Sequence, residues 1–420
     1  MKKSNPTSVF LVFIVVLGLF SIGLRAQEAV SFAVHKAIVV DKQSGSPLGY
    51  AGIAVEGTNL STVTNTDGEF SIKIPATVSN PVLNIQFVGF KSRSIAVTEI
   101  KSDKQKIELE PVAVELPEVS VISKDAETLV ESMFRKKAEN YPLQEEKLTA
   151  FYRETIRKNK SYASLSEAVV DVRKQSYNSY RADVVQIFKA RKKTDYGKVD
   201  TLVFKLMGGP FNSLYLDLLK YPEMIFTDKM LDNYDFTFER STRIGKRLIY
   251  VVDFKQKPHV DEPLYFGKLY IDAQNLALKT ATFCLNLKNR EEAARMFIVK
   301  KPYNADAYPV ETSYRVDFIE KDKKWYFGYS RIEMALRVNW KKKLFNSTFY
   351  STIEMAVTDR KRAEPASETI NKDKIRPNIV IADEISGFSD PDFWGEFNVI
   401  EPEKSIEAAI RKIQKQLEKK

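Results

Sequence analysis

Cysteine and histidine are almost absent from this chain, which limits the chemistry it can perform. Cys284 is the only cysteine, so no disulfide can form within one molecule, and His35 and His259 are the only histidines. A catalytic zinc ion normally takes three protein ligands, with histidine prominent among them. His259-Val-Asp-Glu262 has a ligand-like spacing, but the second histidine lies in a different predicted domain. We interpret this string as a loop between strands, and we expect neither a metal site nor a cofactor.

Motifs for nucleophilic and nucleotide chemistry are also missing. The chain has no Gly-x-Ser-x-Gly sequence and no glycine-rich phosphate loop that follows a strand and opens a helix. Cys284 lies in the apolar run Thr280–Leu285, which favours a buried core position over a reactive thiol. Acidic pairs such as Glu291-Glu292 arise easily by chance among 55 acidic residues. The sequence therefore predicts a non-enzymatic protein with no catalytic residues.

The chain lacks a long apolar run, but its first 26 residues have the pattern of an export signal. Lys2 and Lys3 precede the uncharged run Val9–Phe20, which at 12 residues is shorter than the ~20 that a membrane-spanning helix needs. Leu24-Arg25-Ala26 fits a cleavage site, and no cysteine follows that could carry a lipid. We expect an exported protein in the periplasm or associated with the outer membrane.

Positive charge is in moderate excess. The precursor carries +10, and losing Lys2, Lys3 and Arg25 with the signal leaves +7 (10 − 3). A basic surface suits anionic partners such as lipopolysaccharide or acidic lipid headgroups, although ordinary solvation explains the same charge. The chain contains no nucleic-acid-binding motif, so we expect no nucleic-acid partner.

What the sequence does contain begins with a row of short strands and turns over residues 27–115. The first strand ends at Asp41, and Gln43–Ser46 and Asn65–Gly68 are rich in residues that tolerate turn geometry. Beyond the second turn, Phe70, Ile72 and Ile74 alternate onto one face, as in a half-buried strand. Short strands with frequent turns are typical of a β-sandwich.

Specific motifs in this segment resemble those of the carboxypeptidase regulatory-like domain. They are Val39-Val40-Asp41, Pro47-Leu48, Gly57-Thr58, Thr64 through Gly68 to Phe70, and Val88-Gly89-Phe90. Ser61 departs from the pattern, because many members have glycine there. The resemblance implies a seven-stranded Ig-like or prealbumin-like sandwich, as found in front of outer-membrane TonB-dependent receptors. It also implies a folding and interaction module with no catalytic role.

Residues 116–147 read as a connector followed by a helix, and residues 148–358 as an antiparallel β domain. Apolar residues recur at helical spacing over 125–140. Long consecutive strands predict a large antiparallel sheet or open half-barrel with a few helices. The strands expected from alternation are Leu248–Phe254, Lys268–Ile271, Leu278–Leu287, Glu311–Phe318, Trp325–Val338 and Phe345–Val357. Within them we expect Trp325, Phe327 and Tyr329 to share one face and to pack in a core.

Two segments interrupt this mainly β pattern. Residues 207–233 form an apolar insert, predicted to be one or two short helices lying on the sheet. Residues 359–420 comprise a proline-broken linker, an aromatic docking segment around Phe393-Trp394 and Phe397, and a helix with an apolar stripe that begins at Ile406.

Three functions compete at this point. The first is an exported, non-enzymatic envelope protein with a binding or assembly role, in which the sandwich docks a partner. The β domain would hold an apolar or anionic lipid-like ligand beneath Leu216, Leu219 and Phe226. A half-barrel with a helical cover is similar to the lipoprotein-carrier fold. The alternatives are an envelope hydrolase, acting on peptides or glycans through an unrecognised carboxylate site, and a purely structural component.

Overall fold

The computed structural model describes residues 31–112, 125–159, 161–194, 207–226, 231–297, 305–341, 346–363, 374–381, 393–404 and 406. The predicted export signal, most of the predicted connector and nearly all of the predicted C-terminal helix lie outside these ranges. Within them, no helix combines the length and apolar character required to cross a membrane.

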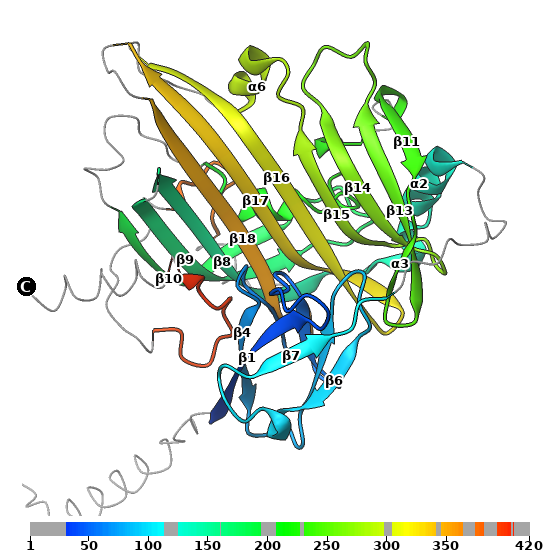
Figure 1. Ribbon diagram of the computed structural model, residues 1–420, viewed down its shortest axis with the longest axis vertical. Coiled ribbons are helices and arrows are strands. Elements are labelled where there is room, and N and C mark those ends of the chain that lie inside the picture. The colour runs from blue at the N-terminus through cyan, green and yellow to red at the C-terminus, as the bar shows by residue number, and fades with distance from the viewer. Residues whose placement is uncertain are drawn as a thin grey trace, which may run out of the picture.

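The N-terminal unit is a sandwich of two sheets with seven strands in total, as the sequence predicted (Figure 1). One sheet has the order β4 (Glu69–Pro75), β1 (Phe32–Asp41), β7 (Lys106–Leu109), and the other β3 (Ser61–Val63), β2 (Gly52–Val55), β5 (Val82–Gln86), β6 (Arg93–Ala96). A one-turn helix η1 (Val97–Glu99) follows β6. The core between the sheets is apolar, with Ile53, Ile72 and Ile85 fully buried. Gly68 is required at its turn, because it has a φ of +74° and a Cβ would lie 2.5 Å from the carbonyl oxygen of Val39.

The second unit is one curved antiparallel sheet of eleven strands. Its order is β10-β9-β8-β18-β17-β16-β15-β14-β13-β11, and β12 also pairs with β13. The strands are β8 (Glu146–Lys158), β9 (Ser161–Lys174), β10 (Val184–Thr194), β11 (Tyr234–Phe238), β12 (Thr242–Ile244), β13 (Arg247–Gln256), β14 (Tyr265–Asp272), β15 (Leu278–Leu285), β16 (Ala305–Lys321), β17 (Lys324–Trp340) and β18 (Ser347–Arg362). The closing strand β18 pairs with the opening strand β8, so the two ends of this domain meet in the middle of the sheet.

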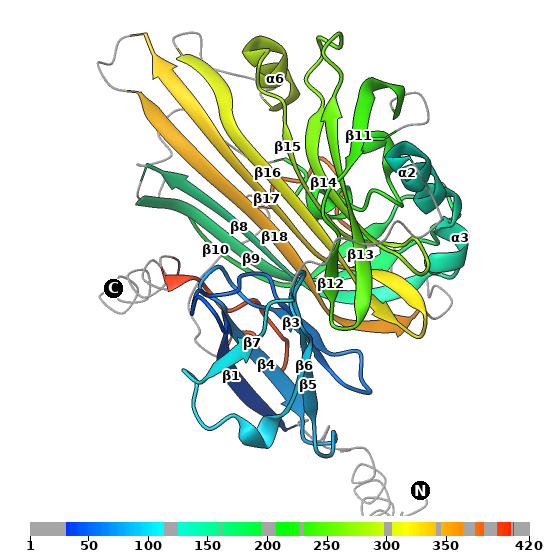
Figure 2. The ribbon, with the colours of Figure 1, turned by 45° about the vertical axis from the view of Figure 1, so that its right-hand side comes forward.

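Helical segments cover one face of this sheet, which we call the inner face. They are α2 (Ala126–Arg135), α3 (Lys137–Asn140), α5 (Pro210–Leu214), η2 (Pro222–Met224) and η3 (Leu231–Asn233), with α6 (Arg290–Phe297) between β15 and β16. Figure 2 shows α2 and α3 beside the β11–β13 end of the sheet. Asp125 caps α2 by accepting a hydrogen bond from the Thr128 N–H, and Lys136 separates α2 from α3. The largest hydrophobic core lies between these segments and the sheet.

The sandwich packs on the opposite face, which we call the outer face. Val63 of β3 meets Phe151, Val169 and Ala356 of the large sheet, and the Ser61 hydroxyl donates to the Val357 carbonyl oxygen. Residues 393–404 run between the two units, with Trp394 edge-on to Phe151 at a ring separation of 5.3 Å. The central strands are therefore buried on both faces.

A β-bulge corrects the expectation that Trp325, Phe327 and Tyr329 share one face. Phe318 pairs with Phe327 while Asp317 pairs with Tyr329, so Gly328 is an extra residue in β17. The alternation therefore reverses at Gly328. Trp325 and Phe327 lie in the inner core, whereas Tyr329 lies on the outer face and stacks on Tyr50 of the sandwich at 5.8 Å. All three side chains are buried.

Candidate functional site

The three residues predicted to cover a ligand lie in the inner core. Leu216, Leu219 and Phe226 are 6%, 0% and 2% exposed. The Phe226 ring packs against Phe254 at 5.0 Å and against Tyr234 at 5.2 Å. They lie between the insert and the inner face, where a ligand cover would have to lie. Their role as a cover stays a prediction.

A buried ion pair cluster fixes this insert to the sheet. Lys174 Nζ at the end of β9 lies 2.8 Å from Asp217 Oδ2 of the insert and 3.2 Å from Asp183 Oδ2. The Tyr177 hydroxyl donates to the same Asp217 oxygen at 2.6 Å. Lys174 is shared by the two carboxylates, and its contact with Asp217 ties the insert to the end of β9.

Other polar groups of the inner face have no ion-pair partner among the described residues. Glu154 of β8 is 3% exposed, and burial raises the pKa of its carboxyl to about 7, with the Tyr152 hydroxyl as its hydrogen-bond donor. Ser166 lies directly opposite Glu154 on β9. The hydroxyls of Ser166, Ser213 and Ser330 are buried and have no hydrogen-bond partner among the residues that the structure describes. Native cores rarely leave such groups unpaired, because each unpaired group costs free energy.

The outer face carries a row of alternating charges across five neighbouring strands, which we call the charged row. Arg191, Glu167, Arg153, Glu354 and Arg331 are paired in register on β10, β9, β8, β18 and β17. The successive N–O separations are 2.7, 2.8, 3.1 and 3.0 Å, and all five residues are buried. Burial alone would raise the pKa of the Glu167 carboxyl. The guanidiniums of Arg153 and Arg191 together lower it by more, so its pKa lies below the usual value.

The C-terminal segment closes over the charged row. Arg153 donates to the Ile400 carbonyl oxygen at 2.8 Å, and Arg331 lies 3.3 Å from Glu403. The guanidinium of Arg191 lies 4.9 Å from the Trp394 ring centroid. The charged row therefore contributes to holding the sandwich, the sheet and the C-terminal segment together.

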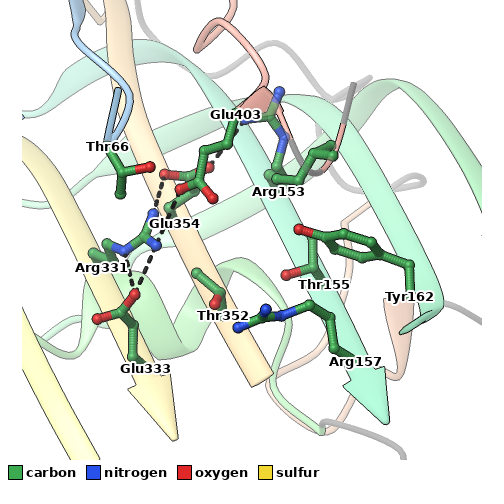
Figure 3. A pocket seen from close by; sticks show the side chains of 11 residues that line it. Thr66, Arg153, Thr155, Arg157, Tyr162, Arg331, Glu333, Thr352, Glu354 and Glu403 are labelled. Carbon is green, nitrogen blue, oxygen red and sulfur yellow. Dashed lines mark hydrogen bonds and ion pairs between the residues drawn. The ribbon is translucent and has the colours of Figure 1, made fainter. Parts of the chain in front are cut away.

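Beside the charged row is a polar pocket of about 150 Å³ (Figure 3). Its base is formed by Thr155 and Thr352, which face each other across β8 and β18. The remaining lining residues are Thr66 of the sandwich, Arg153, Arg157, Tyr162, Arg331, Glu333, Glu354, Glu403 and Ile406. The sandwich, the large sheet and the C-terminal segment all contribute to this pocket, so it exists only when the three are assembled.

The residues considered for other chemistry lie apart. His259 is exposed in the loop between β13 and β14, in agreement with the loop interpretation, and His35 lies in β1 of the sandwich. The expectation of a buried core position for Cys284 is corrected: the side chain is partly exposed, because it alternates with the buried Phe283 and Leu285 of β15. Burial still raises the pKa of its thiol. Within the described ranges, no three His, Cys, Asp or Glu side chains are grouped as a metal site would require.

Sequence reasoning missed the charged row and the pocket. A usable signal was present, because Arg153, Glu154 and Glu167 interrupt otherwise apolar or small residues in the predicted β domain. Charged residues inside a strand that is buried on both faces must pair. The partners of Arg153 and Arg331 lie up to 247 residues away in the chain, so they cannot be chosen from the sequence alone.

Comparison with known proteins identifies one part of the chain. Residues 38–121 match the model of the CarboxypepD_reg-like domain, so the N-terminal sandwich is a domain of this kind, as its motifs predicted. No curated protein matches the chain.

Three solved structures show weak likeness. A LolA superfamily protein from Nitrosomonas europaea has a TM-score of 0.24 and 11% identity, covering 60% of this chain and 99% of that one. Lipovitellin, in a structure of its lipid–protein interactions, has a TM-score of 0.25 and 10% identity, covering 54% of this chain and 26% of that one. A DUF1329 family protein from Desulfovibrio piger has a TM-score of 0.24 and 9% identity, covering 59% of this chain and 97% of that one. Scores this low do not define a shared fold, so the functions of these proteins do not transfer to this chain.

Proposed function

We propose that this protein is an exported, non-catalytic binding protein of the cell envelope, located in the periplasm or at the outer membrane. The curved sheet holds an amphiphilic, lipid-like ligand between its inner face and the insert 207–226. The sandwich serves as the module that fixes the sheet relative to a partner in the envelope. An envelope hydrolase and a purely structural component remain the competing functions.

The observation that supports this proposal best is the pairing of an apolar inner face with unsatisfied polar groups. Ligand sites are mostly apolar and carry a few polar groups that fix orientation. The buried Ser166 hydroxyl has no hydrogen-bond partner in the described part of the chain, and it lies directly across from Glu154, whose carboxylate accepts one hydrogen bond from Tyr152. A ligand with a polar head would satisfy the Ser166 hydroxyl while its chain lies against apolar side chains.

Binding of an environment-sensitive naphthylamine fluorophore, and its displacement by a long-chain phospholipid, tests the proposal. Ser166→Leu places apolar bulk where the polar head would lie, and we expect it to weaken displacement at least fivefold. Ser94→Leu is the matched control, since it makes the same change at an exposed strand position of the sandwich. Equal phospholipid affinities in both variants and the native protein would contradict the proposal.

If Ser166→Leu fails to fold, Glu154→Gln provides the same test without a change in volume. The native protein should then change its ligand affinity across pH 7, where the Glu154 carboxyl titrates. The Gln variant should show no such change. An identical pH profile in both proteins would place the ligand elsewhere.

A further inference from the structure

Arg157 is distinguished from the other arginines of the outer-face pocket by its lack of an acidic partner. The guanidiniums of Arg153 and Arg331 are fully engaged with Glu167, Glu354 and neighbouring carboxylates. Arg157 instead lies between two aromatic rings, 5.2 Å from the centroid of Tyr350 and 5.9 Å from that of Tyr162. No carboxylate in the described part of the chain comes within ion-pairing distance of it.

The groups around Arg157 are hydrogen-bond donors. The Thr155 and Thr352 side chains form the base of the pocket, and neither makes a hydrogen bond to another described residue. Figure 3 shows the Arg157 side chain pointing across this base toward Thr352. A guanidinium with two nearby hydroxyls is a set of donors that suits phosphate or carboxylate oxygens.

The opposite wall has acceptors with spare capacity. Glu333 and Glu403 each use one oxygen, Oε1, to contact Arg331. Their second oxygens can accept hydrogen bonds from hydroxyl groups of a ligand. The pocket volume of about 150 Å³ suits a small ligand group.

We propose that this pocket binds a small oxyanion, with the Arg157 guanidinium contacting the anion and the Thr155 and Thr352 hydroxyls donating from below. The preferred ligand carries hydroxyl groups on the side facing Glu333 and Glu403. This site is separate from the inner face and does not depend on the function proposed above. Because Thr66, Glu403 and Ile406 complete the lining, an occupied pocket also favours the docked arrangement of the sandwich and the C-terminal segment.

Isothermal titration of the full mature chain with glycerol 3-phosphate, inorganic phosphate and acetate tests the proposal. We expect saturable binding of at least one of the three, and at least a tenfold loss of affinity in Arg157→Gln. Arg337→Gln is the matched control. Arg337 lies on the outer face of β17, is exposed and does not line the pocket. It should change the affinity less than twofold, and Thr352→Val should weaken binding about threefold.

The three ligands separate the possible sources of the oxyanion. If the natural ligand is a lipid headgroup, glycerol 3-phosphate should bind most tightly. If it is a free phosphate anion, inorganic phosphate should bind most tightly, and if it is a carboxylate, acetate should. Equal losses in Arg157→Gln and Arg337→Gln would show binding by net surface charge and would overturn the proposal. Absence of binding to all three would also overturn it. A thermal melt of each variant accompanies the titrations, because a solely structural Arg157 would lower the melting temperature and leave oxyanion affinity unchanged.

Discussion

At the scale of single residues, the sheet treats buried carboxylates in two different ways. Glu167 and Glu354 lie between arginines on the outer face, where each charge is neutralised by its neighbours. Glu154, one residue along β8 from Arg153, faces the inner core and receives one hydrogen bond from Tyr152. Alternation of strand side chains separates the two environments, although the residues are adjacent in sequence.

The isolated position of Glu154 predicts a pH dependence of stability. Its pKa is about 7 in the folded protein, above the ordinary value of 4.5. The folded state therefore binds the proton more tightly, and stability falls as pH rises from 4.5 to 7. Glu154→Gln should remove this fall, so that near pH 8 the variant is more stable than the native protein by roughly 3 kcal/mol. Urea denaturation at pH 5 and pH 8 checks this, and an unchanged pH slope would contradict it.

The paired carboxylates predict the opposite kind of effect. Glu354→Gln leaves Arg153 and Arg331 short of a counter-charge in a buried setting, and we expect a loss of about 3 kcal/mol in the free energy of unfolding. Glu239→Gln is the control, because its pair with Lys268 is exposed and should contribute less than about 1 kcal/mol. Equal losses from the two variants in urea titrations would mean that the charged row adds no more than a surface pair.

At the scale of elements, apolar alternation predicted the position of several long strands but not their faces. The sequence indicated a strand over Trp325–Val338, and β17 covers Lys324–Trp340. It did not indicate the bulge at Gly328 that moves Tyr329 to the outer face. A bulge depends on the register of the neighbouring strand, which a single strand's pattern does not contain.

Gly267 of β14 provides a test of how closely two strands approach. A Cβ at this position would lie 2.1 Å from the Thr282 carbonyl oxygen and 2.5 Å from the Phe283 Cα of β15. Since backbone atoms cannot move aside as a side chain does, Gly267→Ala should destabilise the protein by about 2 kcal/mol. Gly52→Ala is the control, because its nearest neighbour would be 3.9 Å away. Thermal melts of both variants decide the matter, and an equal or smaller shift for Gly267→Ala would contradict the close approach.

At the scale of the whole molecule, three segments that are distant in sequence form one assembly. The sandwich, the outer face and residues 393–404 share a core that includes Val63, Phe151 and Trp394. The sequence indicated the sandwich through its motifs and the docking segment through its aromatic residues. It did not indicate that the sandwich packs on the sheet face opposite the helical segments, because that arrangement depends on contacts between residues hundreds of positions apart.

Trp394 provides the test of this assembly. Trp394→Ala should cost about 3 kcal/mol and should increase hydrogen exchange at β3 and at residues 356–358 of β18, where the sandwich meets the sheet. Trp325→Ala is the matched control, since Trp325 is also buried but belongs to the inner core. A loss of protection that is the same in both variants would indicate general destabilisation and not release of the sandwich.

Native mass spectrometry is the decisive test of whether the inner face holds an amphiphilic ligand. The mature protein would be isolated from the envelope fraction of expressing cells, weighed intact, and then denatured and extracted to recover any bound molecule. We expect a lipid-like species at near-stoichiometric level, which Ser166→Leu reduces and Ser94→Leu does not. A mass equal to that of the polypeptide alone, with nothing recovered by extraction, would contradict the claim.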